Sequence, residues 1–212
     1  IGNSHSKDLF NVLHYANKTS QNNILFTRYG LQLSDLTKDH ILWNTPNYKD
    51  ADTIIIATRY SMADLENLEF VINTIHSDKK TILLVANVFE FPGVASGYSL
   101  IDRLVFANSD KKIQTISNIV NQSYFRYFIN AEGNRSNDIN SKLREIANVW
   151  KLKIFDRMDY ICPIQLRVCF VVQADLTKNF YDYGHHTLEG ARFFSNSHII
   201  KGIINELSNN KF

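Results

Sequence analysis

Apolar residues recur along this chain with two different periods, which predict helices alternating with strands. Spacings of three and four residues predict helices at 6–18, at 62–78 and across most of 97–150, and an amphipathic closing helix at 187–207. Short apolar runs predict strands at 22–30, 51–60 and 79–89, and a short edge strand with a turn at 153–159. The positions expected to face the core are Leu9, Phe10, Leu13 and Ala16 in the first helix and Leu65, Leu68, Val71, Ile72 and Ile75 in the second.

The order of these elements favours one α/β domain over residues 1–212. Strands that alternate with helices build a parallel sheet covered on both faces, a doubly wound three-layer α/β/α arrangement. Ligands of such sheets bind at the carboxyl ends of the strands. Ser4, Gly30 and Arg59 each follow a predicted strand, so we expect all three at the same rim. The chain begins at Ile1 without Met, which indicates a domain excised from a longer protein with its first strand truncated.

Composition narrows the class of protein without indicating an activity. Hydrophobic residues make up 44% and charged residues 21% of the 212 positions, as in ordinary globular domains. The net charge is +2 and no cluster of Lys and Arg lies among aromatic residues, which argues against nucleic acid as a partner. No apolar run approaches the roughly 18 residues of a membrane-spanning helix.

The two cysteines, Cys162 and Cys169, are close in the sequence. A zinc site needs four ligands and the chain has no second cysteine pair, so we expect no metal there. Two interpretations stay open from the residues alone. One is a small disulfide loop, which would indicate an oxidising compartment, and the other is a pair of buried thiols.

Ser4 stands at the start of the first predicted helix, in the stretch Gly-Asn-Ser-His. A serine hydroxyl is a good nucleophile only when a base takes its proton and N–H donors stabilise the oxyanion that follows. A helix N-terminus supplies unpaired N–H groups and a favourable dipole, and Gly2 allows a tight turn before it. The alternative is that Ser4 is only the N-cap of the helix, a position in which serine is common.

Asp182 and His185 are three residues apart, just before the closing helix. An aspartate at this spacing can accept the Nδ1–H of the imidazole and leave Nε2 free to take a serine proton. Alone, the pair favours a surface turn. A metal site of Asp182, His185 and His186 is a further alternative that the geometry of adjacent histidines disfavours. Together with Ser4 at the other end of the chain, the pair predicts a Ser–His–Asp triad without a metal.

The stretches GNSH and DYGHHTLEGA resemble the first and last signature blocks of the SGNH/GDSL hydrolase superfamily. More narrowly, the chain is similar to SGNH domains that add or remove acetyl groups on bacterial surface polysaccharides, including those fused to membrane acyltransferases of acyltransferase family three. The strand at 51–60 and the Cys-Pro segment keep the same order, so the resemblance extends over the whole chain. It implies the flavodoxin-like SGNH hydrolase fold, with Ser4 as nucleophile, His185 as general base and Asp182 as the partner that orients His185.

The same resemblance implies two further oxyanion donors, and the chain departs from the pattern at one of them. Gly30 stands where the superfamily has a glycine after its second strand. The expected Gly-x-Asn block after the next strand is absent, and the chain reads Thr58, Arg59, Tyr60 instead. Arg59 is therefore a candidate for binding the oxyanion or the substrate, because a guanidinium donates charge-assisted hydrogen bonds. The alternative is that Arg59 pairs with an acidic neighbour.

By this resemblance, we expect transfer or removal of O-acetyl groups on a bacterial cell-surface polysaccharide through an acyl-enzyme, with O-acetyltransferase favoured over acetylesterase. A non-catalytic glycan- or partner-binding domain is the alternative from another class. No cofactor is expected, although a transferase needs an acetyl donor. The expected partners are a carbohydrate substrate and an upstream membrane acyltransferase domain. The expected location is periplasmic or otherwise extracytoplasmic, with the cytoplasm as the alternative.

Overall fold

The computed structural model describes residues 1–20, 23–93, 98–131 and 135–209. Its helices are α1 (Ser4–Thr19), α2 (Pro46–Lys49), α3 (Met62–Ser77), α4 (Leu100–Ala107), α5 (Ile113–Asn130), α6 (Arg135–Trp150), α7 (Met158–Ile161), α8 (Leu188–Ser195) and α9 (His198–Ser208). Its strands are β1 (Thr53–Ala57), β2 (Thr81–Val85) and β3 (Lys153–Phe155), and short 3-10 turns are η1 (Leu33–Asp35), η2 (Ile41–Asn44) and η3 (Ile164–Leu166).

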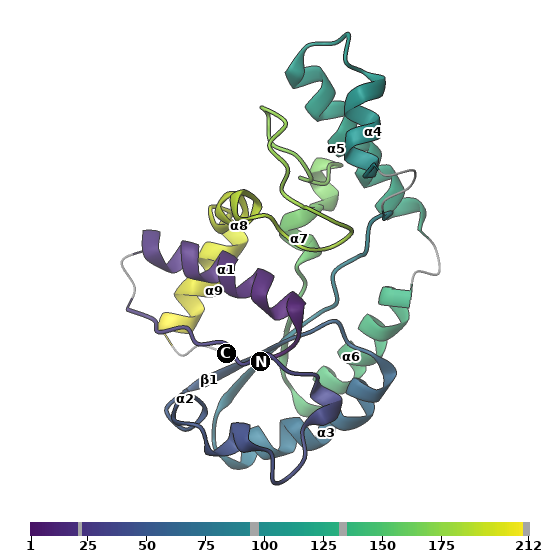
Figure 1. The fold of residues 1–212 in the computed structure, drawn as a ribbon. Helices are drawn as coiled ribbons and strands as arrows, with labels where there is room; N and C mark the ends of the chain where they lie inside the picture. The colour runs from purple at the N-terminus through teal and green to yellow at the C-terminus, as the bar shows by residue number, and fades with distance from the viewer. Residues whose placement is uncertain (21–22, 94–97, 132–134, 210–212) are drawn as a thin grey trace.

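The strands form a parallel sheet in the order β1-β2-β3, with Ile55 beside Leu83 and Val85 beside Phe155. Successive side chains of a strand point to opposite faces, and a parallel sheet is normally buried on both. The face that carries Ile54, Ile56, Ile82 and Leu84 packs against α3 and α6. The face that carries Ala57, Leu83, Val85 and Phe155 packs against α1, α8 and α9. Figure 1 shows these two groups of helices on either side of the sheet.

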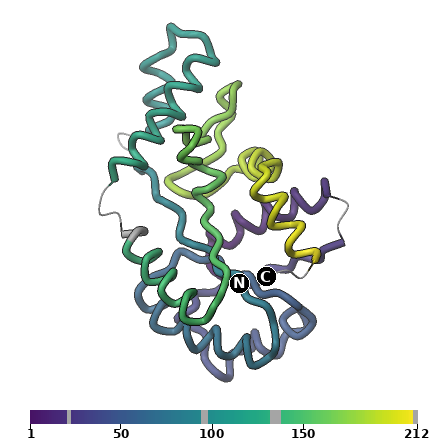
Figure 2. Tube along the Cα trace, turned by 180° about the vertical axis from the view of Figure 1, so that it is seen from behind, coloured from purple at the N-terminus to yellow at the C-terminus, as the bar shows by residue number. Residues whose placement is uncertain are grey.

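Two further segments continue the sheet beyond β1. Ile1 accepts a hydrogen bond from the N–H of Ala57 (3.0 Å), and Gly2 pairs in parallel with Gly30. The segments therefore lie in the order 29–31, 1–2, β1, β2, β3. The chain passes through α1 over one face and through α3 and α6 over the other, as Figure 2 shows from behind. This reversal confirms the doubly wound α/β/α fold and puts its switch point between segment 1–2 and β1.

The helices α4 and α5 form a hairpin that extends away from the sheet (Figure 1). The side chain of Asn121 in α5 holds Val172, because its Nδ2 donates to the carbonyl oxygen (3.0 Å) and its Oδ1 accepts from the N–H (3.1 Å). A disulfide joins Cys162 to Cys169 in the same region. Of the two interpretations of these cysteines, the disulfide is therefore confirmed and the pair of buried thiols is wrong. Within the described ranges, no helix has the length and apolarity needed to span a membrane.

Most of the predicted helices are confirmed, including the inward positions of the helix now seen as α3. In α1, Leu9, Leu13 and Ala16 are buried, whereas Phe10 is only half-buried and stacks on His14. Val12 takes the core position instead.

Two predicted elements are wrong. The strand expected at 22–30 does not form in its described part, 23–30, where Gly30 alone makes a β-bridge and Leu25 is 88% exposed. Backbone pairing with the neighbouring segment 1–2 is confined to the end of this stretch, where the N–H of Gly2 donates to the carbonyl oxygen of Tyr29, so the residues before it do not join the sheet. The single closing helix is in fact α8 followed by α9, because Ser197 caps a new helix by accepting the N–H of Ile200 (3.2 Å).

Candidate active site

Ser4 is the first residue of α1 and lies at the switch point of the sheet. Asn3, rather than Ser4, is the N-cap, and its Oδ1 accepts the N–H of His5 at 3.2 Å. The alternative that Ser4 only caps the helix is therefore wrong. Gly2 has a φ of 139°, and a Cβ added there would lie 2.0 Å from the carbonyl oxygen of Ala57. Only glycine fits this approach to β1.

Ser4, His185 and Asp182 form a continuous chain of hydrogen bonds. The Ser4 Oγ lies 3.0 Å from His185 Nε2, across 181 positions of sequence, and His185 Nδ1 lies 2.7 Å from Asp182 Oδ2. An ionised carboxylate can only accept, so the imidazole proton is assigned to Nδ1 and Nε2 is the acceptor for the serine hydroxyl. The three side chains thus have the geometry needed to move a proton off Ser4.

The Asp182 carboxylate is held by the backbone of its own turn. Its Oδ1 accepts the N–H of Gly184 (2.9 Å) and of His185 (2.8 Å). Burial is the largest single influence and would raise the pKa of Asp182, but these donors and the imidazole outweigh it and lower the pKa below its ordinary value. Asp182 is therefore ionised at neutral pH and holds the tautomer that a serine base needs.

Gly30 and Arg59 reach the same rim as Ser4, as the order of strands predicts. The N–H of Arg59 donates to Asn3 Oδ1 (3.1 Å), while Gly30 lies on the other side, in register with Gly2. Neither residue is hydrogen-bonded to Ser4 within the described part of the chain. Their assignment to the oxyanion site stays a prediction.

The guanidinium of Arg59 already has partners. It forms an ion pair with Glu90, in which Nη2 donates to Oε2 at 2.8 Å, and it lies over the ring of Tyr183 with Cζ 5.8 Å from the ring centre. The acidic neighbour considered as the alternative is thus present. An anion at this rim would have to share the guanidinium with Glu90.

The backbone N–H of Ser4 is a different kind of donor. It belongs to the first turn of α1, where N–H groups have no partner within the helix, and no other acceptor meets it among the described residues. It lies next to the hydroxyl oxygen that would form the tetrahedral intermediate. This N–H can therefore donate to an oxyanion at that position.

His186, next to His185, belongs to the core. It is 5% exposed, with its ring centre 4.9 Å from those of Phe180 and Phe194. Burial first, and then the charge of Arg157, lower its pKa to about 3, so it is neutral. This environment is that of a packing residue and not of a substrate contact. In the described ranges, no group of three His, Cys, Asp or Glu side chains is placed to hold a metal ion.

The sequence analysis missed a buried polar cluster beneath the triad. His5, Asp8 and Arg157 are 1%, 4% and 0% exposed. A signal for part of it exists, because His5, Asp8 and Val12 follow the three- and four-residue spacing of the inward face of α1. A charged residue such as Asp8 within the apolar face of a helix is unusual, and it indicates a candidate functional site.

Tyr181 is a second residue that the sequence analysis missed. Its ring lies nearly parallel to that of His185, with 5.6 Å between ring centres and 13° between planes, and the residue is 62% exposed. It therefore presents an open aromatic surface beside the triad.

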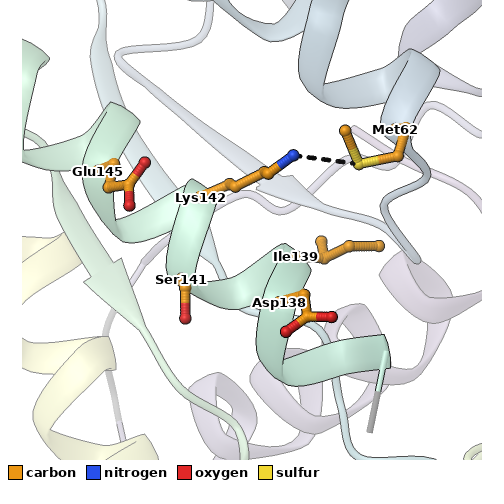
Figure 3. Close-up of a pocket in the computed structure, with 6 residues that line it drawn as sticks. All are labelled: Met62, Asp138, Ile139, Ser141, Lys142 and Glu145. Atoms are coloured by element: carbon orange, nitrogen blue, oxygen red, sulfur yellow. Dashed lines mark hydrogen bonds between the residues drawn. The ribbon is translucent and has the colours of Figure 1, made fainter. Parts of the chain in front are cut away.

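A surface hollow of about 520 Å³ lies between Met62, the first residue of α3, and residues 138–145 of α6 (Figure 3). The Nζ of Lys142 crosses it to the Sδ of Met62, at 3.8 Å. None of the triad residues lines this hollow, so it is not the space in which the triad would meet a substrate.

Comparison with known proteins identifies a family. A family model described as "SGNH domain (fused to AT3 domains)" matches residues 1–197, a range that holds both Ser4 and the Asp182–His185 pair. No curated protein matches the chain, and no solved structure does.

Proposed function

The chain belongs to the family of SGNH domains that are fused to AT3 domains, and we propose that it is a serine-dependent enzyme that transfers or removes O-acetyl groups on a bacterial cell-surface polysaccharide. Acyl-ester hydrolysis and acetyl transfer are the chemistry of this family. The observation that carries the proposal is the unbroken hydrogen-bond chain from Ser4 through His185 to Asp182.

In the first half-reaction, Ser4 Oγ attacks the carbonyl carbon of an acetyl ester while His185 Nε2 takes the hydroxyl proton. The N–H of Ser4 donates to the oxyanion, and Asp182 stabilises the imidazolium. Collapse of the tetrahedral intermediate breaks the bond to the donor alcohol, which leaves with the proton from His185. The acetyl group stays on Ser4 as an ester.

In the second half-reaction, the oxygen of a hydroxyl group attacks the acetyl carbon and gives its proton to His185; the bond to Ser4 Oγ then breaks, and His185 returns the proton to Ser4. Water as acceptor releases acetate, whereas a sugar hydroxyl forms a new ester. We favour the sugar, because the family is fused to AT3 domains, and an upstream membrane acyltransferase domain would supply the acetyl groups. The esterase alternative uses the same residues and differs in whether the site excludes water. We propose no cofactor for either route, and the transferase route needs an acetyl donor.

We place the domain in the periplasm or another extracytoplasmic compartment. The disulfide between Cys162 and Cys169 supports this location, since such bonds persist in oxidising compartments. Thiol titration of the denatured, non-reduced protein, made outside the cytoplasm, should find no free thiol. Two free thiols would remove this support.

The test of the catalytic proposal is p-nitrophenyl acetate turnover by wild type, Ser4→Ala and His185→Ala, with and without a neutral oligosaccharide. We expect each substitution to lower kcat by about 10⁴-fold or more, because the triad acts as a unit. Ser77→Ala and His76→Ala are the matched controls. These two residues are the last of α3, outside the triad, and both variants should retain wild-type rates.

The outcomes separate the candidate functions. Acetyl-sugar formed only with the wild type and the controls means a transferase, and acetate release that ignores the oligosaccharide means an esterase. If wild type and both triad variants are folded and equally inert, the catalytic proposal is wrong and a non-catalytic glycan-binding domain takes its place.

A further inference from the structure

The buried polar cluster beneath the triad has no part in the reaction steps above. Arg157, the residue before α7, is 0% exposed and is among the largest fully buried side chains. A guanidinium so deep in a protein is rare, because the loss of water must be offset by partners inside. The position of Arg157 therefore has to be explained by the groups it holds.

Arg157 holds the residue next to the nucleophile, 152 positions away in the sequence. Its Nη1 donates to the carbonyl oxygen of His5 at 3.1 Å, and its Nη2 lies 3.4 Å from Nδ1 of the same residue. A guanidinium can only donate, so Nδ1 of His5 is the acceptor and the proton of its neutral ring is on Nε2. The planar guanidinium thus holds both the backbone and the imidazole ring of His5.

His5 connects this guanidinium to two members of the triad. It follows Ser4 directly, so its carbonyl group helps to orient the first turn of α1, which presents the Ser4 hydroxyl. Its ring centre lies 4.8 Å from that of His185, with 44° between the planes. Reacting groups must keep their geometry to a fraction of an ångström, so a shift of His5 would disturb both nucleophile and base.

We propose that Arg157 is a positioning residue that clamps His5 and, through His5, holds Ser4 and His185 at reacting distance. This inference rests on the proposed function, since it assigns Arg157 to the chemistry of the triad and not to folding alone. Burial first, and then the charge of Arg157, lower the pKa of His5 to about 2, so His5 is uncharged. A neutral His5 does not repel the positive charge that forms on His185 during the reaction.

The test compares two substitutions of the full chain. Arg157→Lys keeps the charge and loses the planar guanidinium, whereas Arg157→Met keeps only the approximate length. Arg144→Met is the matched control, because Arg144 forms a surface ion pair with Asp156, the residue before Arg157. Circular dichroism follows folding, and a fluorophosphonate that labels the active serine counts competent sites.

We expect kcat for p-nitrophenyl acetate, per labelled site, to fall by about 10- to 100-fold in both Arg157 variants, the cost of a displacement of about an ångström. KM should change little, since the displaced groups act in the chemical step. Arg144→Met should stay within about twofold of wild type, as is usual for a surface substitution away from a site.

The pH dependence of activity is a second measurement, and it should not change if Arg157 has only a structural role. In Arg157→Met the pKa of His5 rises toward its ordinary value, because one of the charges that lower it is gone. The other groups that act on His5, namely His185, Arg59 and His186, are unchanged. Burial, the largest cause of the lowered pKa, remains, so the rise is partial, and the extra loss of activity through a charged His5 beside His185 is expected only at the acid end of the profile.

Each outcome decides the matter. If folded Arg157→Lys keeps the wild-type kcat per labelled site and the wild-type pH profile, the proposal is wrong and Arg157 only supports the fold. If Arg157→Met does not fold, Arg157→Lys decides alone. If wild type neither reacts with the fluorophosphonate nor turns over the ester, the proposed function fails and this inference fails with it. An active wild type with unaffected Arg157 variants overturns the positioning role only.

Discussion

Two aspartates act on His185 from different elements, and their surroundings move their pKa values in opposite directions. Asp182 lies in the turn before α8, accepts two backbone N–H groups and the imidazole, and has a lowered pKa. Asp8 lies within α1, is 4% exposed, and has an Oδ2 without a hydrogen-bond partner among the described residues. Burial raises the pKa of Asp8 to about 6, although Arg157 and His185 act against the rise.

The comparison shows that hydrogen-bond donors, more than nearness to the imidazole, decide what a carboxylate does. Asp182 stays ionised because its donors outweigh burial, so it can fix the tautomer of His185 and stabilise its charged form. Asp8 has fewer donors, since the backbone N–H of His186 is the one that lowers its pKa and its Oδ2 has no partner among the described residues, so burial prevails and Asp8 takes up a proton in weakly acidic solution. Environments that separate the pKa values of two carboxyl groups commonly separate their roles.

The largest expected effect tests this division directly. Asp182→Asn should lower kcat for p-nitrophenyl acetate by about 10⁴-fold, because an amide can stabilise the wrong imidazole tautomer. Asp8→Asn should lower it less than about tenfold, since Asp8 reaches His185 only through space. Rates are measured per fluorophosphonate-labelled site. Equal losses in the two variants would contradict the division of roles.

The difference between the two aspartates also marks how far the sequence can predict this site. Asp182 and His185 are predictable because a short spacing encodes their contact, and Ser4 because it stands at the start of a predicted helix in the block Gly-Asn-Ser-His. Arg157 gives no such signal, since its partner His5 is 152 positions away and their contact exists only in the folded protein.

The fold shows the same limit. The strands β1 and β2 were predicted because a continuous apolar run is enough to indicate burial on both faces. The run 22–30 predicts a strand, but most of its described part, 23–30, has no strand to pair with, because pairing is a property of the sheet and not of the run. The split between α8 and α9 depends on one capping serine, Ser197, within an otherwise continuous helical pattern.

A third carboxylate, that of Glu90, acts on the candidate oxyanion donor Arg59 and not on His185. It pairs with Arg59, whose side chain is 53% exposed. If Arg59 assists the oxyanion, Arg59→Ala should lower kcat by about tenfold, less than the roughly 10²- to 10³-fold of a preorganised buried donor. Glu90→Gln should leave kcat unchanged or raise it, because it releases the guanidinium. Equal losses in both variants would show that the ion pair itself, and not Arg59 as a donor, supports activity.

The last expected effect is on stability and not on rate, and there the two aspartates should have opposite signs. Between about pH 4 and pH 6 the folded protein keeps a proton on Asp8 that the unfolded chain has released, because the pKa of Asp8 is raised from 3.8 to about 6. The free energy of unfolding of wild type should therefore fall relative to Asp8→Asn as the pH rises through this window, by up to about 3 kcal/mol. Urea unfolding at several pH values measures the difference.

Asp182→Asn provides the opposite case in the same experiment. Because the folded-state pKa of Asp182 is lowered, its ionised form contributes stability above its ordinary pKa, and this contribution is lost as the pH falls through the lowered value. Wild type should thus gain stability relative to Asp182→Asn as the pH rises through the acid range, while it loses stability relative to Asp8→Asn. A constant difference between wild type and Asp8→Asn from pH 4 to pH 7 would mean that Asp8 is ionised throughout. In that case Arg157, rather than burial, would dominate its surroundings.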